Sequence, residues 1–193
     1  MTVTTNHTSY QLAARQLPAG AARAAVFTRH YDADIADVWD ACTDPERLRR
    51  WWQPVEGDLR VGGRFTQGDF GPGLVLRCEA PNVLTIAVGG GDPHTDQIEL
   101  RLTPAADGGT DLEFEHATCL DTHEIGGQIY DAVYCMGGGY GPRLVTLEQH
   151  LNGTLPGDVD VRALHMRDDY RDPINDSMAA LDELLISSGQ KRV

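Results

Sequence analysis

The segment DIADVWDACTDPERLRRWWQP, residues 34–54, predicts two short helices in succession. Its apolar residues recur three and four positions apart and share one helical face (Ile35, Val38, Trp39 and Cys42). Asp34 precedes the first helix as an N-cap, and Asp44 precedes the second in the same way. Pro45 then occupies the first helical position and Glu46 the first turn, which is the usual start of a helix.

Short alternating segments lie on both sides of this helical pair and predict β-strands. AAVFTRHY, residues 24–31, precedes the pair as a first strand. Between residues 55 and 118 the strand-like segments are GDLRVGGRFTQG, GLVLRCEAP, NVLTIAVGGG, DQIELRLTPAADGG and TDLEFEHATC. Glycine, proline and asparagine separate them at intervals of about 10–12 residues, which predicts consecutive antiparallel strands joined by tight turns.

Helical periodicity returns in the last third of the chain. Residues 125–153 carry one apolar stripe and predict a long helix that ends at Gly153. Consecutive glycines and Pro142 interrupt this helix, so we expect a kink or a break within residues 137–142. A polar connector follows, and after it an amphipathic tail helix over residues 173–188.

These elements divide the chain into an N-terminal arm (residues 1–23), a central domain (24–153) and a C-terminal extension (154–193) that contains the tail helix. The order of elements in the central domain predicts an α+β fold, because a sheet with one apolar face needs a cover and the long helix supplies it. Where such a sheet curves around its helix a cavity opens, which is a usual place for a small ligand.

Charge and composition exclude several classes of protein. With 29 acidic and 16 basic residues the formal net charge is −13, which argues against nucleic-acid binding and against binding to anionic membranes. No apolar run approaches the ~20 residues that span a bilayer, and the polar N-terminus does not resemble a signal peptide. The cysteines form no CxxC pair and are expected to be reduced. The sequence therefore predicts a soluble cytoplasmic protein.

Together these segments resemble the heat-shock-protein-90 ATPase activator homologue family. The resemblance rests on residues 34–54 and on DLRVGGRF, GLVLRCEAPNVL and GGTDLEFEHA in this order, and it covers about residues 24–153. The family belongs to the START-like (SRPBCC) helix-grip superfamily. The resemblance thus implies a curved antiparallel sheet wrapped around a long C-terminal helix, with an internal pocket. Residues 119–139 are longer here than is usual in the family, and the tail helix lies outside it.

Trp51 and Trp52 are the most conspicuous candidates for ligand binding. An indole can line a pocket and present its N–H to a ligand. A tryptophan after a short helix can equally fill the core between helix and sheet, and both interpretations stay open. Phe65 and Gln67, on a strand-like segment, join the candidates, and Asp69 and Phe70 near the following turn are weaker ones.

His116 is the candidate catalytic residue. It shares one face of an alternating segment with Leu112 and Phe114, which we expect to face the long helix. A neutral imidazole there can hydrogen-bond a ligand carbonyl or act as a general base, or it is a core histidine satisfied by a backbone carbonyl. Tyr134 and Tyr140, on the long helix, can direct hydroxyls into the same space or pack with the hydroxyl at water.

No metal and no cofactor are predicted. One polar stretch brings residues of metal-ligand type together within nine residues (His116, Cys119, Asp121, His123 and Glu124). Their spacing fits no standard ligand pattern, so the stretch is interpreted as a strand followed by a loop. The sequence also lacks a GxSxG motif, a P-loop and a dinucleotide-binding fingerprint.

The leading hypothesis is a protein that binds a small hydrophobic or aromatic molecule between sheet and long helix. Its candidate ligand-binding residues are Trp51, Trp52, Phe65, Gln67, Phe114, His116, Tyr134 and Tyr140. A first alternative is an enzyme of the cyclase, dehydratase or hydrolase type with His116 as its acid–base residue. A second, which the family resemblance implies, is a co-chaperone-like or regulatory interaction module. The apolar stripe of the tail helix predicts either a homodimer through that helix or packing on its own domain.

Overall fold

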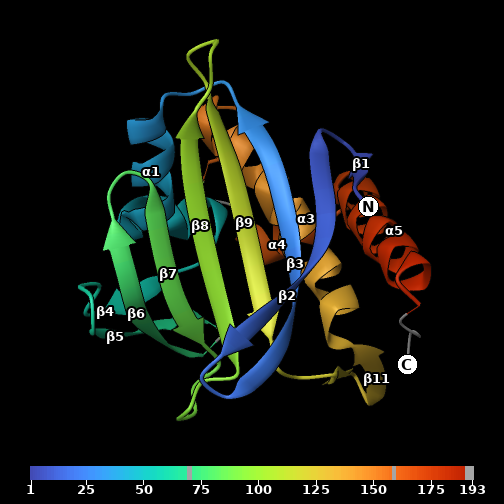
Figure 1. The fold of residues 1–193 in the computed structure, drawn as a ribbon. Coiled ribbons are helices and arrows are strands. Elements are labelled where there is room, and N and C mark those ends of the chain that lie inside the picture. Colours follow the sequence, from blue (N-terminus) through green and yellow to red (C-terminus); the bar gives the residue numbers. More distant parts are fainter. Residues whose placement is uncertain (69–70, 158–159, 190–193) are drawn as a thin grey trace.

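A nine-stranded antiparallel sheet dominates the computed structural model, which describes residues 1–68, 71–157 and 160–189. The strands lie in the order β1-β2-β3-β9-β8-β7-β6-β5-β4. Their bounds are β1 Val3–Thr5, β2 Thr8–Leu17, β3 Gly20–Tyr31, β4 Val55–Gly57, β5 Arg64–Gln67, β6 Pro72–Glu79, β7 Val83–Val88, β8 Asp96–Pro104 and β9 Thr110–Thr118. The long helix packs on one face of this curved sheet (Figure 1), so the predicted α+β helix-grip fold is confirmed.

Residues 3–17 belong to this sheet, although the sequence pattern predicted an arm over residues 1–23. β2 pairs with β3 along its full length and buries Tyr10 against the core. Asn6 and His7 form the turn between β1 and β2 with left-handed φ angles of 47° and 60°, as two-residue hairpins require. Alanines and polar residues interrupt the alternation in β2, which explains why the strand is hard to detect in the sequence.

Helices α1 (Ile35–Thr43) and α2 (Pro45–Trp51) begin where the sequence predicted. The Asp34 carboxylate caps α1 by accepting a hydrogen bond of 2.9 Å from the backbone N–H of Asp37. The Asp44 carboxylate caps α2 through bonds of 2.7 and 3.0 Å from two backbone N–H groups of its first turn. Each carboxylate thus satisfies N–H groups that have no partner within the helix.

The long helix α3 runs without a break from Ala132 to Leu151. The predicted start at residue 125 was wrong, because β10 (Thr122–Ile125) and β11 (Gln128–Asp131) form a separate hairpin there. The Asp131 carboxylate ends this hairpin and caps α3, accepting bonds of 2.9 and 3.2 Å from backbone N–H groups of the first turn. The helix also continues through residues 137–142, so the break that was one predicted outcome is not found.

The tail helix α5 (Arg171–Ser187) packs against α3, β1 and β2 of its own chain (Figure 1). Its buried residues are Ser177, Ala180, Leu181, Leu184 and Leu185. The hydroxyls of Ser177 and Tyr10 lie 2.9 Å apart in a buried hydrogen bond between α5 and β2. The buried part of the apolar stripe is therefore covered within the chain, the second of the two outcomes predicted for it.

The connector between α3 and α5 contains the short helix α4 (Val161–His165) and the 3₁₀ helix η2 (Asp168–Tyr170). Val161, Leu164 and Tyr170 are buried and attach this segment to the body of the molecule. None of the helices in the described ranges is both long enough and apolar enough to cross a bilayer.

Candidate functional site

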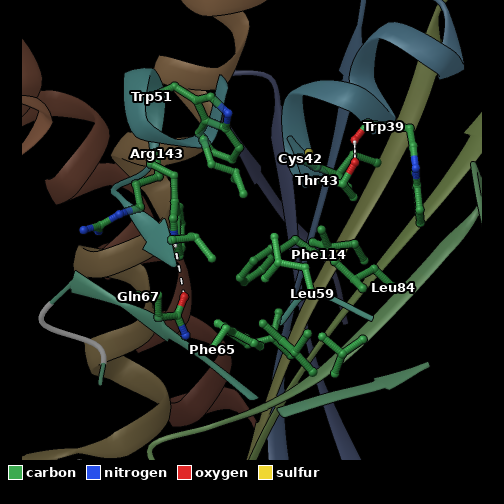
Figure 2. Close-up of a pocket in the computed structure, with 18 of the residues that line it drawn as sticks. Trp39, Cys42, Thr43, Trp51, Leu59, Phe65, Gln67, Leu84, Phe114 and Arg143 are labelled. Atoms are coloured by element: carbon green, nitrogen blue, oxygen red, sulfur yellow. Dashed lines mark hydrogen bonds between the residues drawn. The ribbon is translucent and has the colours of Figure 1, made fainter. Parts of the chain in front are cut away.

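A cavity of about 280 Å³ lies between the sheet and helices α1, α2 and α3 (Figure 2). The sheet supplies a mainly aliphatic wall of Val75, Leu84, Ile86, Ile98, Leu100 and Leu112, together with Phe65, Gln67, Cys78 and Phe114. The helices and the segment after α2 supply Trp39, Cys42, Thr43, Leu48, Trp51, Trp52, Val55, Leu59, Tyr140, Arg143 and Leu144. The wall thus suits an apolar molecule and presents few hydrogen-bonding groups.

The three tryptophans of the chain all line this cavity. The indole N–H of Trp51 donates a bond of 2.8 Å to the backbone carbonyl of Ala41 and so ties α2 to α1. The indole N–H of Trp52 donates to Oε1 of Gln67 at 3.4 Å, across the cavity wall. Both rings are buried as well as facing the cavity, so the two interpretations left open for them apply together.

Aromatic rings close one side of the cavity. The ring of Trp52 is parallel to that of Tyr140 with centroids 5.8 Å apart, and Tyr140 in turn lies 4.5 Å from Phe114. The guanidinium carbon of Arg143 lies 4.9 Å from the centroid of the Trp52 ring. Figure 2 shows this guanidinium pointing away from the cavity, so the charge remains outside the apolar wall.

His116 lies beyond the end of the cavity, in a buried chain of hydrogen bonds. Its Nε2 is 3.2 Å from the Asp96 carboxylate, and its Nδ1 is 2.8 Å from the hydroxyl of Tyr140. One ring nitrogen thus faces a carboxylate, which only accepts, and the other faces a hydroxyl, which can donate or accept. Tyr140 both lines the cavity and contacts His116, and the cavity-lining residues that the structure describes do not include His116.

Burial and these hydrogen bonds shift the pKa values of both partners of His116. Burial acts to raise the pKa of Asp96, but hydrogen bonds from His116, Thr95 and Thr118 outweigh burial and lower it. Burial raises the pKa of the Tyr140 hydroxyl, which therefore stays protonated and can donate to His116. Each ring nitrogen of His116 is thus engaged by a protein group, as expected for a histidine that orients its neighbours.

Tyr134 also lies outside the described wall of the cavity. It is buried at the start of α3, where its ring stacks on Tyr130 of the β10–β11 hairpin with centroids 6.5 Å apart. Of the predicted ligand-binding residues, the structure therefore brings together Trp51, Trp52, Phe65, Gln67, Phe114 and Tyr140. Asp69 and Phe70 lie outside the described residues.

Sequence reasoning missed most of the aliphatic wall and the contribution of α1. The missed strand residues alternate as pairs two positions apart, such as Leu84 with Ile86 and Ile98 with Leu100. Alternate residues of a strand share a face of the sheet. These residues could therefore have been found by asking which positions of each strand lie on the same face as Phe114. From α1 the cavity receives Cys42, and burial raises the pKa of its thiol to about 12. This cysteine is therefore part of the apolar wall rather than a nucleophile.

The polar stretch after β9 does not assemble into a metal site. Within residues 1–68, 71–157 and 160–189 no three histidine, cysteine or acidic side chains are arranged to hold a metal ion. His123 pairs with Tyr130 in the backbone register of the β10–β11 hairpin, and Cys119 lies beside the backbone carbonyl of Gly20.

His165 sets an expected pH dependence of stability. Burial, assisted by the positive charge of Arg143, lowers the pKa of His165 from 6.5 to about 4. Between these values the unfolded chain binds a proton that the folded chain does not. The free energy of unfolding is therefore expected to fall as the pH decreases from 6.5 toward 4. Allowing for partial exposure of the ring, the loss is about 1–2 kcal/mol.

Urea unfolding of the wild type and of His165→Gln at several pH values across this interval measures the effect. The variant should lose less stability than the wild type as the pH falls. Burial also lowers the pKa of His150, but that residue titrates in both proteins and cancels in the comparison. Parallel pH profiles for the two proteins would contradict the assignment.

Comparison with known proteins places this geometry among related folds. Residues 32–152 match the family model described as Activator of Hsp90 ATPase homolog 1-like protein. The crystal structure of CalU16 from Micromonospora echinospora is similar with a TM-score of 0.73 and 31% sequence identity, over 93% of this chain and 98% of that chain. Its solution structure gives a TM-score of 0.75 at 31% identity, over 96% and 99% of the two chains. Coverage this high means that the similarity includes most of the C-terminal extension.

A more distant similarity shows the fold alone. The solution structure of the Aha1 dimer from Colwellia psychrerythraea matches with a TM-score of 0.55 and 16% identity, over 68% of this chain and 97% of that chain. Comparison with curated proteins gives no match.

Proposed function

The chain belongs to the family of Activator of Hsp90 ATPase homolog 1-like proteins, and we propose that it binds a small hydrophobic or aromatic molecule in the cavity between its sheet and α3. The observation that carries this proposal is the cavity itself, about 280 Å³ with a wall of aliphatic and aromatic side chains. A space of this kind, left unfilled by side chains, costs packing energy that a bound apolar ligand restores.

The position of His116 favours binding over catalysis. Both ring nitrogens are engaged by Asp96 and Tyr140, and the ring lies behind the aromatic wall. A general base must come within hydrogen-bonding distance of the proton that it abstracts. The enzymatic alternative therefore receives no support from the geometry around His116.

Titration with an apolar tricyclic compound, fluorene, tests the proposal through tryptophan emission. Because Trp39, Trp51 and Trp52 all line the cavity, bound fluorene contacts or approaches every tryptophan of the chain. We expect a saturable change in emission with a 1:1 end point and a micromolar dissociation constant.

The control is Thr85→Val, since Thr85 lies between Leu84 and Ile86 on β7 and faces away from the cavity toward Glu99. This variant should bind fluorene like the wild type. A linear, non-saturating response in both proteins would contradict the proposed function.

A further inference from the structure

One hydrogen-bonding pair stands out in the mainly apolar wall of the cavity, namely the indole of Trp52 and the amide of Gln67. Gln67 is only 3% exposed. Its Nε2 is buried and donates to no acceptor among the described residues. A buried amide N–H without an acceptor is costly in a folded protein, so its presence in the wall of a cavity calls for an explanation, and a bound acceptor would supply one.

The orientation of this amide follows from its neighbours. An indole N–H can only donate, so Oε1 of Gln67 faces Trp52 and Nε2 faces elsewhere. The bond from Trp52 is long, at 3.4 Å, and therefore weak. The backbone of Gln67 is held separately, by a bond of 2.9 Å from the side-chain amide of Gln53 to its carbonyl. The amide can thus turn about its terminal torsion, which is soft, while its backbone stays in place.

We infer that the ligand is a neutral, ring-containing molecule with a hydrogen-bond acceptor oxygen, such as a carbonyl, and that Gln67 donates to this oxygen. The inference rests on the proposed function and specifies its ligand class. Turning the amide directs Nε2 into the cavity and releases the Trp52 N–H, so that two donors converge on one acceptor. The charge of Arg143 points away from the cavity (Figure 2), which leaves an ionised ligand group without a counter-ion.

A matched pair of probes separates this inference from simple apolar binding. Fluorene and 9-fluorenone share a tricyclic skeleton, and they differ in that fluorenone carries a carbonyl oxygen. The wild type should bind fluorenone about 3- to 10-fold more tightly than fluorene, the ratio that one or two net hydrogen bonds supply. Tryptophan emission reports both titrations.

Gln67→Met keeps the length of the side chain and removes its N–H groups. In this variant fluorenone binding should weaken about 3- to 10-fold, while fluorene binding stays within a factor of about two, the scale of a volume-conserving swap. The carbonyl stretch of bound fluorenone gives a second readout. It should move to lower frequency in the wild type and in Thr85→Val. In Gln67→Met it should return only part of the way toward its value in an apolar solvent, because the Trp52 N–H remains as a donor.

Each outcome has a distinct meaning. Equal affinities for the two probes in the wild type, or an unshifted carbonyl stretch, overturn the inference and leave apolar binding standing. An equal loss of affinity for both probes in Gln67→Met also overturns it, because a general disturbance of the cavity then explains the effect. Failure of the wild type to bind either probe contradicts the proposed function, and the inference falls with it.

Discussion

Replacing Gly141 by alanine is expected to lower the free energy of unfolding by about 2 kcal/mol or more, although alanine favours helix formation over glycine by up to about 1 kcal/mol. The reason is the close contact between α3 and α5. A Cβ at Gly141 would lie 1.7 Å from Oγ and 2.5 Å from Cβ of Ser177. Ser177 cannot turn aside without losing its hydrogen bonds to Tyr10 and to the backbone carbonyl of Pro173.

A matched glycine in the same helix supplies the control. A Cβ at Gly139 would meet no atom within 4 Å. Gly139→Ala should therefore raise the free energy of unfolding by about 0.5–1 kcal/mol, the helix propensity gain alone. Urea unfolding of both variants measures the two opposite shifts.

Removing the obstructing side chain should reduce the cost of the alanine at position 141. In a double-mutant cycle, Gly141→Ala is expected to cost less when Ser177 is replaced by glycine. If Gly141→Ala and Gly139→Ala shift stability equally, the tight α3–α5 contact is not present in solution.

These glycines also show where sequence reasoning about the fold reached its limit. Local signals are strong enough to locate α1 and α2, because Asp34 and Asp44 are followed directly by helical periodicity. The glycines of α3 were interpreted through local propensity and predicted a kink or a break. Gly137 and Gly141 instead allow a close approach of α5 at Ser177, a long-range contact that no local pattern contains.

The N-terminal hairpin and the start of α3 were missed for related reasons. The turn at Asn6 and His7 is a recognisable signal, but the strand that follows it alternates only weakly, since part of it is covered by α5 rather than by a continuous core. Asp131 could have been identified as the cap of α3, yet the apolar residue Ile129 extended the helical pattern across it. In the structure Ile129 is exposed on β11.

Part of the candidate site was predictable, from conspicuous aromatic residues on the helices and from alternation in β9. Trp51, Trp52, Phe114 and Tyr140 line the cavity as their patterns suggested. His116 shares the face of Phe114, but the cavity ends between these two residues because the ring of Tyr140 fills the space above β9. Alternation determines the face of a side chain and leaves open how far along the strand a cavity extends.

Replacing Gly73 by alanine is expected to weaken fluorene binding at least about 10-fold while costing less than about 1.5 kcal/mol of stability. Gly73 pairs with Phe65 across β5 and β6, and a Cβ at Gly73 would lie 2.3–2.8 Å from three atoms of the Phe65 ring. The backbone can accept alanine, because Gly73 is not among the glycines with positive φ. The ring must therefore move, and since Phe65 lines the cavity it moves into the space that the ligand occupies.

Shortening the displaced side chain should restore that space. The double variant Phe65→Ala/Gly73→Ala is expected to regain most of the fluorene affinity, because the methyl group at position 73 then has no ring to displace. Gly139→Ala serves as a glycine-to-alanine control, with a Cβ that meets nothing within 4 Å, and should bind fluorene like the wild type.

Unchanged affinity in Gly73→Ala would mean that fluorene binds elsewhere, because a ring pushed into a cavity of about 280 Å³ cannot leave room for a tricyclic ligand there. A loss of affinity that Phe65→Ala does not relieve would instead indicate a distortion of β6. Restoration by the second substitution thus assigns the ligand to the space between Phe65 and the aromatic wall.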